Sequence, residues 1–210
     1  MSVTVYHLNN SRSQRIIWLL QHLQVDYVIK AYDMDTLTRR APVELKQIHP
    51  LGRCPMISHN GRVIVETGAI IEYLVETFTD PINLLPKSLD DKLQVRFWLH
   101  FAEGSAMTDI VIHANTANME REELLKTKVY PRLINIFGFI EQHLKEHEWF
   151  AGEFSGADIA MSMPIEIFLM KRIVDIDTKG MERWANQIHQ MPSYQQALSK
   201  VEKYVYVGKN

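Results

Sequence analysis

The hydrophobic pattern of this chain changes once, near residue 79, and the change limits the folds that its 210 residues can form. Before that point, short runs of alternating apolar and polar residues take turns with segments in which apolar residues recur every three or four positions. Beyond it, only the second pattern continues. Alternation is typical of strands, and the longer spacing is typical of helices. The sequence therefore predicts an α/β region over 1–79, a linker over 80–86 and an all-α region over 87–210.

The α/β region has the predicted order βαβαββα. Val3–Leu8 and Tyr27–Tyr32 are strand-like, and the segment between them carries apolar residues at helical spacing. A shorter helix is predicted near Pro42–Ile48. Asn60-Gly61 then separates two short apolar runs, which is the strongest short signal for a β-hairpin. Thr67 can cap the helix that closes the region. We expect the first two strands to be parallel, because a crossover helix joins them, and the hairpin strands to be antiparallel.

The second region is predicted to be a helical bundle. Apolar spacing indicates one long helix over Leu93–Val111 and a second over Val129–Leu144, with Pro131 either in its first turn or at a kink. Ser155 and Asp158 form a capping box at the start of a third helix, with Asp in place of the commoner Glu or Gln. Two further helical segments follow. We assign the capping box to stability.

Charge and cysteine content narrow the function classes. The formal net charge of −2 argues against nucleic acid as the main partner, because phosphate binding needs a concentrated basic face. Cys54 is the one cysteine of the chain, so no intrachain disulfide can form and a reducing compartment is expected. The first ten residues lack the pattern of a secretory signal, and no apolar stretch approaches the roughly 20 residues that span a bilayer. We expect a cytoplasmic protein with neither a membrane nor a nucleic-acid partner.

Four short motifs occur in a defined order along the chain. They are Ser11–Arg15 after the first strand, His49–Pro55, Glu66-Thr67 and Ser155–Ile159. In this order and at these spacings, the sequence resembles the glutathione transferase superfamily over essentially its whole length. The stretch Glu44–Arg53 is similar to the fungal and bacterial serine-type branch, the one related to yeast glutathione transferase I.

The resemblance implies a fold and an activity. The fold is a thioredoxin-like domain over 1–79, which binds glutathione as co-substrate, followed by an all-helical domain over 87–210. The protein is expected to be a homodimer that uses no metal. The implied activity is the transfer of glutathione to small hydrophobic alkyl or aryl electrophiles in detoxification, with glutathione-dependent peroxidase activity as a second use of the same thiolate.

Glutathione must be ionised at its sulfur before it can attack. A free thiol has a pKa near 8.5, and lowering that value by about two units requires about 2.7 kcal/mol of preferential stabilisation of the thiolate. A hydrogen bond to an ionised acceptor supplies about 1.5–3 kcal/mol, and a helix N-terminus adds about 0.3–1 kcal/mol. One hydroxyl between the first strand and the first helix is therefore sufficient. The resemblance assigns this catalytic role to Ser11, four residues before Arg15.

Other side chains compete with Ser11 for that role. Ser13 is two residues away, and Tyr6 lies in the first strand, near the place of the phenol in the tyrosine-type branch of the family. Arg12 can stabilise a thiolate by its charge or can face solvent. Ser11 itself can be a plain helix cap, which is a common role for serine. The sequence leaves these alternatives open, with Ser11 first.

The resemblance also implies how the tripeptide is held. The Cys54-Pro55 bond is expected to be cis, so that the backbone of Cys54 pairs with glutathione like an added strand. Glu66 would accept from the γ-glutamyl ammonium, and Thr67 with the following helix N-terminus would hold the α-carboxylate. Arg53 would lie near the glycyl carboxylate. Plain structural roles compete: a helix cap for the Glu66-Thr67 pair and a solvated surface position for Arg53.

A redox role for Cys54 is the less favoured alternative. A thioredoxin-type enzyme would carry a cysteine near the start of the first helix, and the stretch 9–15 contains none. The thiol of Cys54 therefore need not react.

The electrophile is expected to lie against the first long helix of the second region and the C-terminal tail. The candidate residues are Ser105, Met107, Ile112 and Tyr204. The first two helices of that region are also expected to form the homodimer interface. These residue types do not identify the electrophile. A glutathione-dependent isomerase or dehalogenase, and a non-catalytic binding module on the same fold, stay open as alternatives.

One motif suggests a different chemistry and is set aside. The stretch His143–His147 fits the H-x-x-E-H pattern of inverted zinc proteases. It lies at the polar end of a predicted helix, and its two histidines would need a third ligand from another segment. We expect a solvated helix end here and no metal.

Overall fold

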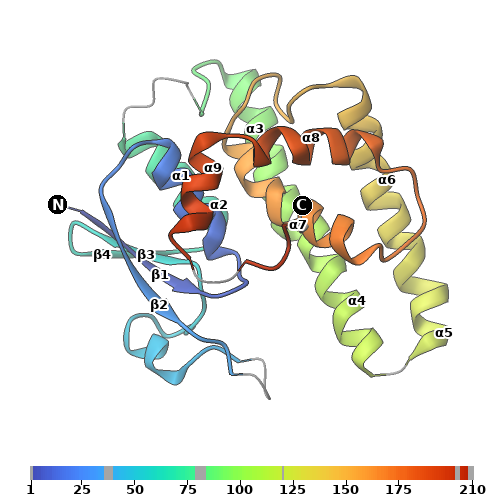
Figure 1. Ribbon diagram of the computed structural model, residues 1–210, viewed down its shortest axis with the longest axis horizontal. Helices are drawn as coiled ribbons and strands as arrows, with labels where there is room; N and C mark the ends of the chain where they lie inside the picture. Colours follow the sequence, from blue (N-terminus) through green and yellow to red (C-terminus); the bar gives the residue numbers. More distant parts are fainter. Residues whose placement is uncertain (1, 36–39, 79–83, 120, 202–203, 208–210) are drawn as a thin grey trace. The chain divides into compact units, whose positions relative to one another are not determined.

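The structure is a computed structural model that describes residues 2–35, 40–78, 84–119, 121–201 and 204–207. It divides into two compact units (Figure 1). One comprises Met1–Leu85 together with His189–Val207, and the other is built on Pro86–Ile188. The segment His189–Val207 therefore packs with the N-terminal region, which the sequence pattern did not indicate. The division into domains at 1–79 and 87–210 stays a prediction, and most of the predicted linker lies outside the described residues.

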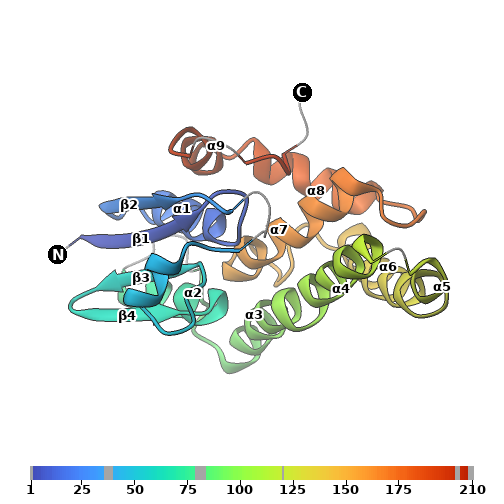
Figure 2. The same ribbon diagram turned by 90° about the horizontal axis from the view of Figure 1, so that it is seen from below.

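The first unit contains a four-stranded sheet with the order β2-β1-β3-β4 (Figure 2). Its strands are β1 Val3–Leu8, β2 Tyr27–Tyr32, β3 Met56–His59 and β4 Arg62–Val65. β1 and β2 run parallel, whereas β1 and β3, and β3 and β4, are antiparallel. The β3–β4 turn has positive φ at both Asn60 and Gly61, 51° and 75°, as a type I′ hairpin requires. The predicted thioredoxin-like arrangement is confirmed.

Two helices cover one face of this sheet, and a third packs on the first of them. α1, Ser13–His22, packs against β1 and against α2, Thr67–Thr77. α9, Pro192–Ser199, packs against α1, and the rings of Trp18 and Tyr194 meet edge-on at 5.0 Å. Every residue from 13 to 20 is buried, the polar Ser13, Gln14 and Arg15 of the first turn as well as the apolar run from Ile16 to Leu20.

The other face carries the short 3-10 helix η1, Val43–Gln47, where the sequence predicts a shorter helix. Leu45 of η1 packs with Tyr6 of β1 and Met56 of β3 in one buried cluster. Successive side chains of a strand point to opposite faces of the sheet. Tyr6 therefore faces η1, and His7, the next residue, faces α1.

The second unit is a bundle of helices. α3 Leu89–Phe101, the π-helix η2 Ala102–Met107 and α4 Thr108–Asn118 follow one another without interruption, so the long predicted helix contains a π-helical segment (Figures 1 and 2). The remaining helices are α5 Glu122–Leu124, η3 Leu125–Val129, α6 Tyr130–Glu146, α7 Gly156–Lys171 and α8 Lys179–His189. Pro131 lies in the first turn of α6, where its missing N–H costs no helical hydrogen bond.

The capping box at the start of α7 is present. The side chain of Ser155 accepts from the backbone N–H of Ala157 at 3.2 Å, and Asp158 accepts from the backbone N–H of Ser155 at 2.9 Å. Asp158 also accepts from the backbone N–H of Phe150 at 3.3 Å and from the indole of Trp184 at 3.0 Å. Burial raises the pKa of Asp158 to about 6. The box thus ties the start of α7 to the loop before it and to α8.

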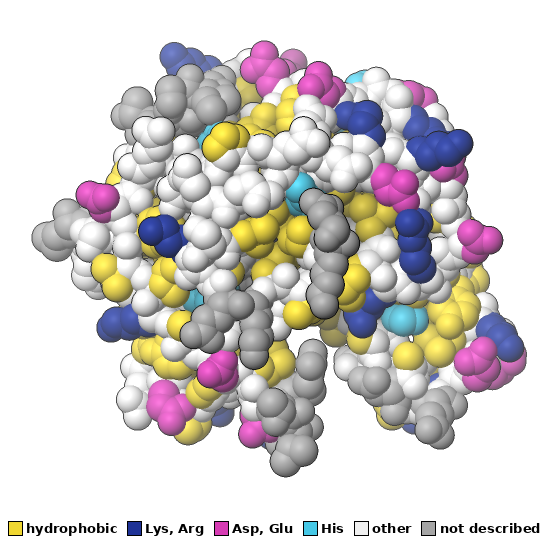
Figure 3. Space-filling model, in the orientation of Figure 1, with side chains coloured by type: hydrophobic (Ala, Val, Ile, Leu, Met, Phe, Trp, Pro, Cys, Tyr) yellow, Lys and Arg dark blue, Asp and Glu magenta, His cyan; other side chains and the backbone are white. Residues whose placement is uncertain are grey.

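None of the described helices combines the length and the apolar character that crossing a bilayer demands. On the face drawn in Figure 3, acidic and basic side chains are interspersed with neutral ones. Among the residues described on that face, Figure 3 shows no concentrated basic area of the kind that phosphate backbones require.

Candidate active site

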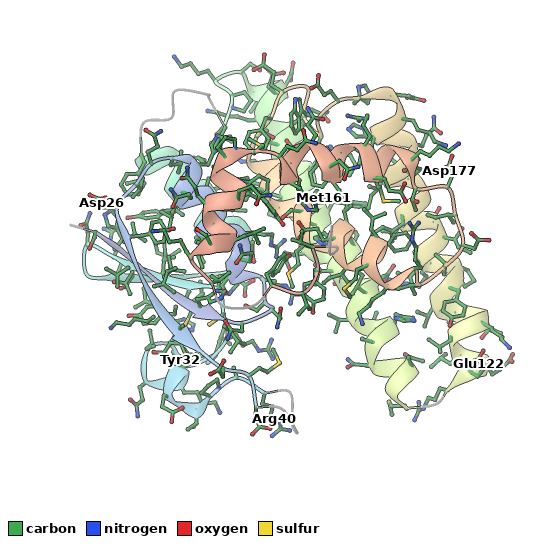
Figure 4. All side chains as sticks on the ribbon, in the orientation of Figure 1. Asp26, Tyr32, Arg40, Glu122, Met161 and Asp177 are labelled. Atoms are coloured by element: carbon green, nitrogen blue, oxygen red, sulfur yellow. The ribbon has the colours of Figure 1, made fainter. Side chains whose placement is uncertain are left out.

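Three loops meet at one edge of the sheet. The register pairs Tyr6 of β1 with Met56 of β3, and Met56 with Val65 of β4. The end of β1, the beginning of β3 and the end of β4 therefore share this edge, which Tyr32, at the end of β2, marks in Figure 4. The segments that leave or enter the sheet there carry the predicted residues Ser11, Cys54, Pro55, Glu66 and Thr67. Backbone pairing alone brings these segments together.

Ser11 lies between β1 and α1, two residues before the helix begins. Its side chain is half-buried, and its Oγ lies 2.8 Å from the Oγ of Ser13. The backbone N–H of Ser13 donates to the same Oγ at 3.3 Å, and the carbonyl of Ser11 accepts from the backbone N–H of Gln14 at 3.2 Å. The hydroxyl is thus held at the N-terminal end of α1, where the helix dipole favours a negative charge.

Ser13, the second candidate, is engaged in the interior. Its side chain is fully buried, and its Oγ accepts from the backbone N–H of Leu8 at 3.1 Å. The same oxygen lies 2.8 Å from Nδ1 of His7 and 3.3 Å from the carbonyl of Leu8. Ser13 therefore supports the turn between β1 and α1 and has no surface left for a ligand.

Tyr6, the third candidate, points to the other face of the sheet. Its ring belongs to the cluster with Leu45 and Met56, and its O–H donates to the Oγ of Ser58 at 3.4 Å. Of the three competing hydroxyls, Ser11 is the one that combines partial exposure with a place at the converging loops.

His7 is a member of this site that the sequence reasoning missed. The ring is 2% exposed, between the sheet and α1. Burial disfavours the charged ring and lowers the pKa of His7 to about 4, and a weaker interaction with the Asn9 side chain offsets a small part of this. The ring is therefore neutral at physiological pH. The alternation of Val3, Val5 and His7, all buried, was the sequence signal that could have revealed it.

The Cys54–Pro55 peptide bond is cis, as the resemblance implied. Pro55 is buried, Cys54 is half-buried and Arg53 is exposed. Burial raises the pKa of the Cys54 thiol to about 12, so this thiol is protonated at neutral pH and is a poor nucleophile. That protonation state argues against the redox alternative and agrees with a main-chain role for Cys54.

Glu66 and Thr67 lie at the junction of β4 and α2. Glu66 is exposed, and its φ of 74° is one that residues other than glycine rarely adopt. Backbone strain of this kind is found most often at ligand sites. The expectation that Thr67 caps α2 is wrong, because Thr67 is already the first helical residue and Glu66 takes the cap position, without a side-chain cap hydrogen bond. The buried Thr67 instead places its backbone N–H in the first turn of the helix.

The sequence is similar to known proteins along its whole length. Residues 1–76 match the family model of the glutathione S-transferase N-terminal domain. Glutathione S-transferase 1 of Saccharomyces cerevisiae is 31% identical over 232 aligned positions, which cover 99% of this chain and 97% of that protein. The chain belongs to the glutathione S-transferase family.

Solved structures share the fold of this glutathione S-transferase. A glutathione S-transferase from Actinobacillus pleuropneumoniae superposes with a TM-score of 0.85 at 28% identity, covering 97% of this chain and 94% of that one. Ure2p in complex with glutathione superposes with a TM-score of 0.79 at 20% identity, covering 93% and 97%. The predicted superfamily and its two-part fold are therefore confirmed.

The residues predicted for the electrophile lie in both units of this glutathione S-transferase. Ser105 and Met107 belong to η2, where Ser105 is half-buried and Met107 is buried, and Ile112 is exposed on α4. Tyr204 follows α9 in the first unit, with its ring 5.5 Å from that of Tyr206. A π-helical segment shifts the residues after it around the helix, and such segments are frequent at functional sites. That these four residues share one pocket stays a prediction.

The H-x-x-E-H stretch is structural in a way that was not expected. His143 is half-buried, and its ring packs against those of Trp98 at 4.7 Å and Phe150 at 5.6 Å. Burial lowers the pKa of His143. The expected solvated helix end is therefore wrong for His143, because it faces aromatic rings of α3 and of the loop before α7, whereas His147 is exposed. Within the described residues, no three or more His, Cys, Asp or Glu side chains form a group that could hold a metal ion.

Proposed function

We propose that this protein is a glutathione transferase in which Ser11 donates a hydrogen bond to the glutathione sulfur, stabilises the thiolate and directs it at a hydrophobic electrophile. One observation carries the proposal. The Ser11 hydroxyl stands at the sheet edge where the Cys54-Pro55 and Glu66-Thr67 loops converge, while Tyr6 and Ser13 are engaged in the interior. Membership of the glutathione S-transferase family supports the reaction class.

The interactions at this place are strong enough to ionise a thiol. A hydrogen bond to the thiolate contributes about 1.5–3 kcal/mol, and the N-terminus of the ten-residue helix α1 contributes about 0.3–1 kcal/mol. Together these lower the thiol pKa by roughly one to three units from 8.5. Arg12, at the N-cap position of α1, adds a positive charge to the same end of the helix. Much of the bound glutathione then carries a thiolate at neutral pH.

The neighbouring loops hold the rest of the tripeptide in this proposal. The backbone of Cys54 pairs with the cysteinyl backbone of glutathione as an added strand would. Glu66 accepts from the γ-glutamyl ammonium, and Thr67 with the N-terminus of α2 holds the α-carboxylate. Arg53 pairs with the glycyl carboxylate. The glutathione complex of Ure2p, which has the same fold, supports glutathione as the ligand of this proposal.

The electrophile completes the reaction. The thiolate attacks an electrophilic carbon held against Ser105, Met107, Ile112 and Tyr204, and the displaced group leaves with the bonding electrons. The same thiolate can reduce a peroxide: its sulfur attacks the O–O bond and becomes a sulfenic acid while the other oxygen leaves as an alcohol or water. A second glutathione then displaces the sulfenic oxygen, which leaves as water, and the disulfide forms. A cytoplasmic role in detoxification follows from these reactions and from the single, unreactive cysteine.

The functional form in this proposal is a homodimer. α3 presents an exposed stripe of Leu89, Leu93 and Phe97 at helical spacing, and Phe139 of α6 extends it, with its ring 6.4 Å from that of Phe97. We name these four residues the α3–α6 apolar face. Contiguous exposed apolar area of this kind is typical of an association surface, and the occupant proposed here is the same face of a second copy.

The test is a titration of bound glutathione by its thiolate absorbance, in wild type and in Ser11→Ala, together with turnover of a generic aryl halide. The thiol pKa is expected to rise by about one to two units in the variant, and turnover near pH 6.5 to fall at least about tenfold. An unchanged pKa and rate would show that Ser11 is not the catalytic hydroxyl. Product analysis with a maleyl isomer and with a halogenated phenol separates isomerase and dehalogenase activity. Glutathione binding without any turnover would identify a binding module.

A further inference from the structure

A chain of three side chains leads from the interior of the first unit to Ser11. Nδ1 of His7 lies 2.8 Å from Oγ of Ser13, and Oγ of Ser13 lies 2.8 Å from Oγ of Ser11. Both distances are those of good hydrogen bonds. His7 and Ser13 are buried, so water does not compete for their hydrogen-bonding groups.

The oxygen of Ser13 has two lone pairs and one hydrogen. The backbone N–H of Leu8 donates to it at 3.1 Å and occupies one lone pair. One lone pair and one hydrogen remain for His7 and Ser11, and the carbonyl of Leu8, at 3.3 Å, is a longer alternative acceptor. His7 decides how they are shared, because Nδ1 is a donor in one neutral tautomer and an acceptor in the other.

When the proton of His7 is on Nδ1, the hydroxyl hydrogen of Ser11 stays available for a ligand. His7 then donates to Ser13, and Ser13 donates to Ser11. Ser11 accepts from the Ser13 hydroxyl and from the Ser13 backbone N–H at 3.3 Å, so both of its lone pairs are occupied. Its own hydrogen is left for a ligand.

When Nδ1 of His7 is unprotonated, donors and acceptors exchange roles along the hydrogen bonds from His7 to Ser11. Ser13 then donates to His7, and the 2.8 Å contact between the two hydroxyls requires Ser11 to donate to Ser13. The hydrogen of Ser11 is consumed inside the protein, and a sulfur beside it receives none. The tautomer of one buried histidine thus decides whether Ser11 can act on a thiolate.

We infer that His7, as its Nδ1–H tautomer, and Ser13 are positioning residues that direct the hydroxyl hydrogen of Ser11 toward the glutathione sulfur. The inference rests on the proposed function of Ser11 and explains what orients the hydrogen of its hydroxyl. The hydrogen bonds from His7 to Ser13, from Ser13 to Ser11 and from Ser11 to the thiolate then all point toward the sulfur, and each polarises the next. His7 and Ser13 act through Ser11.

The surroundings of His7 favour this tautomer. Its Nε2 is buried and makes no hydrogen bond to any described residue; the interaction with the Asn9 side chain that raises the pKa of His7 slightly does not have the geometry of a hydrogen bond. A buried N–H without a partner is rarer than a buried acceptor without one. Because burial also keeps the ring neutral, only one of the two nitrogens carries a proton. That proton belongs on Nδ1, against Ser13.

Nitrogen NMR of histidine-labelled full-length protein tests the tautomer directly. The His7 signals, assigned by their loss in His7→Asn, are expected to show the pattern of a neutral ring protonated at Nδ1, with and without glutathione. The pattern of a ring protonated at Nε2 would overturn the inference. This measurement needs no substrate and no turnover.

Substitutions test the consequence for the bound thiol. Ser13→Ala and His7→Leu are expected to raise the pKa of bound glutathione by about half a unit to one unit. The value of kcat/KM should fall about three- to tenfold below that pKa and recover above it, since a thiolate formed at high pH no longer needs the donor. His7→Asn is expected to restore the wild-type thiol pKa, because its amide N–H can take the place of Nδ1–H. A purely structural role would give neither this rescue nor the recovery at high pH.

Two matched substitutions serve as controls. His59→Leu removes another buried histidine of the same sheet, whose Nδ1 lies 2.8 Å from the hydroxyl of Tyr73. Ser162→Ala removes another buried serine, whose Oγ donates to the carbonyl of Ile159 at 3.0 Å. Both are expected to leave the thiol pKa unchanged.

The outcomes separate the inference from the function on which it rests. If Ser11→Ala raises the thiol pKa but Ser13→Ala and His7→Leu do not, the inference is wrong and the proposed function stands. If Ser11→Ala has no effect, the proposed function itself is wrong. Should Ser13→Ala fail to fold, His7→Leu and the NMR tautomer still decide the question.

Discussion

At the scale of the residue, His7 couples the candidate site to the stability of the fold. Its Nδ1 meets Ser13 at 2.8 Å, and burial holds its pKa at about 4. In the unfolded chain the ring is hydrated and titrates near 6.5. Between these two values the unfolded chain binds a proton that the folded chain excludes, so acid favours unfolding. The contribution of the neutral His7 ring to the free energy of unfolding is fully present above pH 6.5 and is lost as the pH falls toward 4.

We therefore expect His7 to lower the free energy of unfolding by about 2–3 kcal/mol when the pH is reduced from 7 to 4.5. His7→Asn removes the titrating ring, so the acid dependence of the variant should be shallower by that amount. Urea unfolding of both proteins at the two pH values measures the difference. Equal pH dependence in the two proteins would contradict a buried neutral ring at His7.

The sequence predicted the loops of the site better than the side chains that support them. Ser11, Cys54 and Glu66 follow or precede strands, and strand ends can be located from alternation and turn residues. His7 was missed because an inward residue of a strand is ordinarily a core residue, and the partner that gives it a further role, Ser13, lies across a turn. Thr67 was misassigned because apolar periodicity does not fix a helix start to within one residue.

At the scale of the element, a buried carboxylate of one helix caps another. Glu141 of α6 accepts from the backbone N–H groups of Gly180 at 2.8 Å and Met181 at 2.9 Å, in the first turn of α8. Gly180 permits the close approach, because a Cβ there would lie 3.0 Å from the backbone nitrogen of Lys145 and 3.1 Å from the carbonyl oxygen of Glu141. Groups so far apart in the chain leave no local pattern in the sequence.

Glu141→Gln is expected to destabilise the second unit by about 1–3 kcal/mol. The amide keeps the shape of the side chain, but its NH₂ group faces a backbone N–H, and the charge that favours the helix N-terminus is lost. Glu146→Gln, an exposed change on the same helix, should stay within about 0.5 kcal/mol of wild type. Urea unfolding of the three proteins gives the comparison. Similar losses in both variants would show that the contact of Glu141 with α8 contributes nothing specific.

Helix order was predictable, whereas helix detail was not. The long predicted helix corresponds to α3, η2 and α4, but one π-helical segment leaves the apolar spacing of 93–111 almost unchanged and is therefore invisible in it. Likewise, α9 packs against α1 through pairs such as Trp18 Nε1 donating to Ser193 Oγ at 3.2 Å. Periodicity indicates that both helices have an apolar face and does not indicate which partner covers it.

At the scale of the whole molecule, the α3–α6 apolar face bears on assembly. Leu93 is 62% exposed and Phe97 is 44% exposed in the single chain. The rings of Phe97 and Trp98 are in turn packed against Phe139, so the face has a rigid aromatic base. A rigid apolar face loses little conformational entropy when it associates, which favours the homodimer proposed above.

Leu93→Glu is expected to weaken the homodimer by roughly 100-fold, or about 3 kcal/mol, because it places a carboxylate in an apolar contact. The side chain is largely exposed, so the fold of the single chain and its thermal midpoint should be preserved. Sedimentation equilibrium at micromolar concentration measures the shift. Val28→Glu, at an apolar position on β2 that is 51% exposed, should leave the dimer intact. A wild-type monomer would exclude the homodimer, and a dimeric Leu93→Glu would place the interface elsewhere.

The monomeric variant also separates assembly from thiol activation. His7, Ser11, Ser13, Cys54, Glu66 and Thr67 all belong to the first unit of one chain. The pKa of bound glutathione is therefore expected to be the same in Leu93→Glu as in wild type, and the thiolate titration described for Ser11→Ala measures it. A raised pKa in the monomer would mean that a second copy contributes to stabilising the thiolate. The hydrogen bonds from His7 through Ser13 to Ser11 would then not be sufficient to account for the thiol pKa.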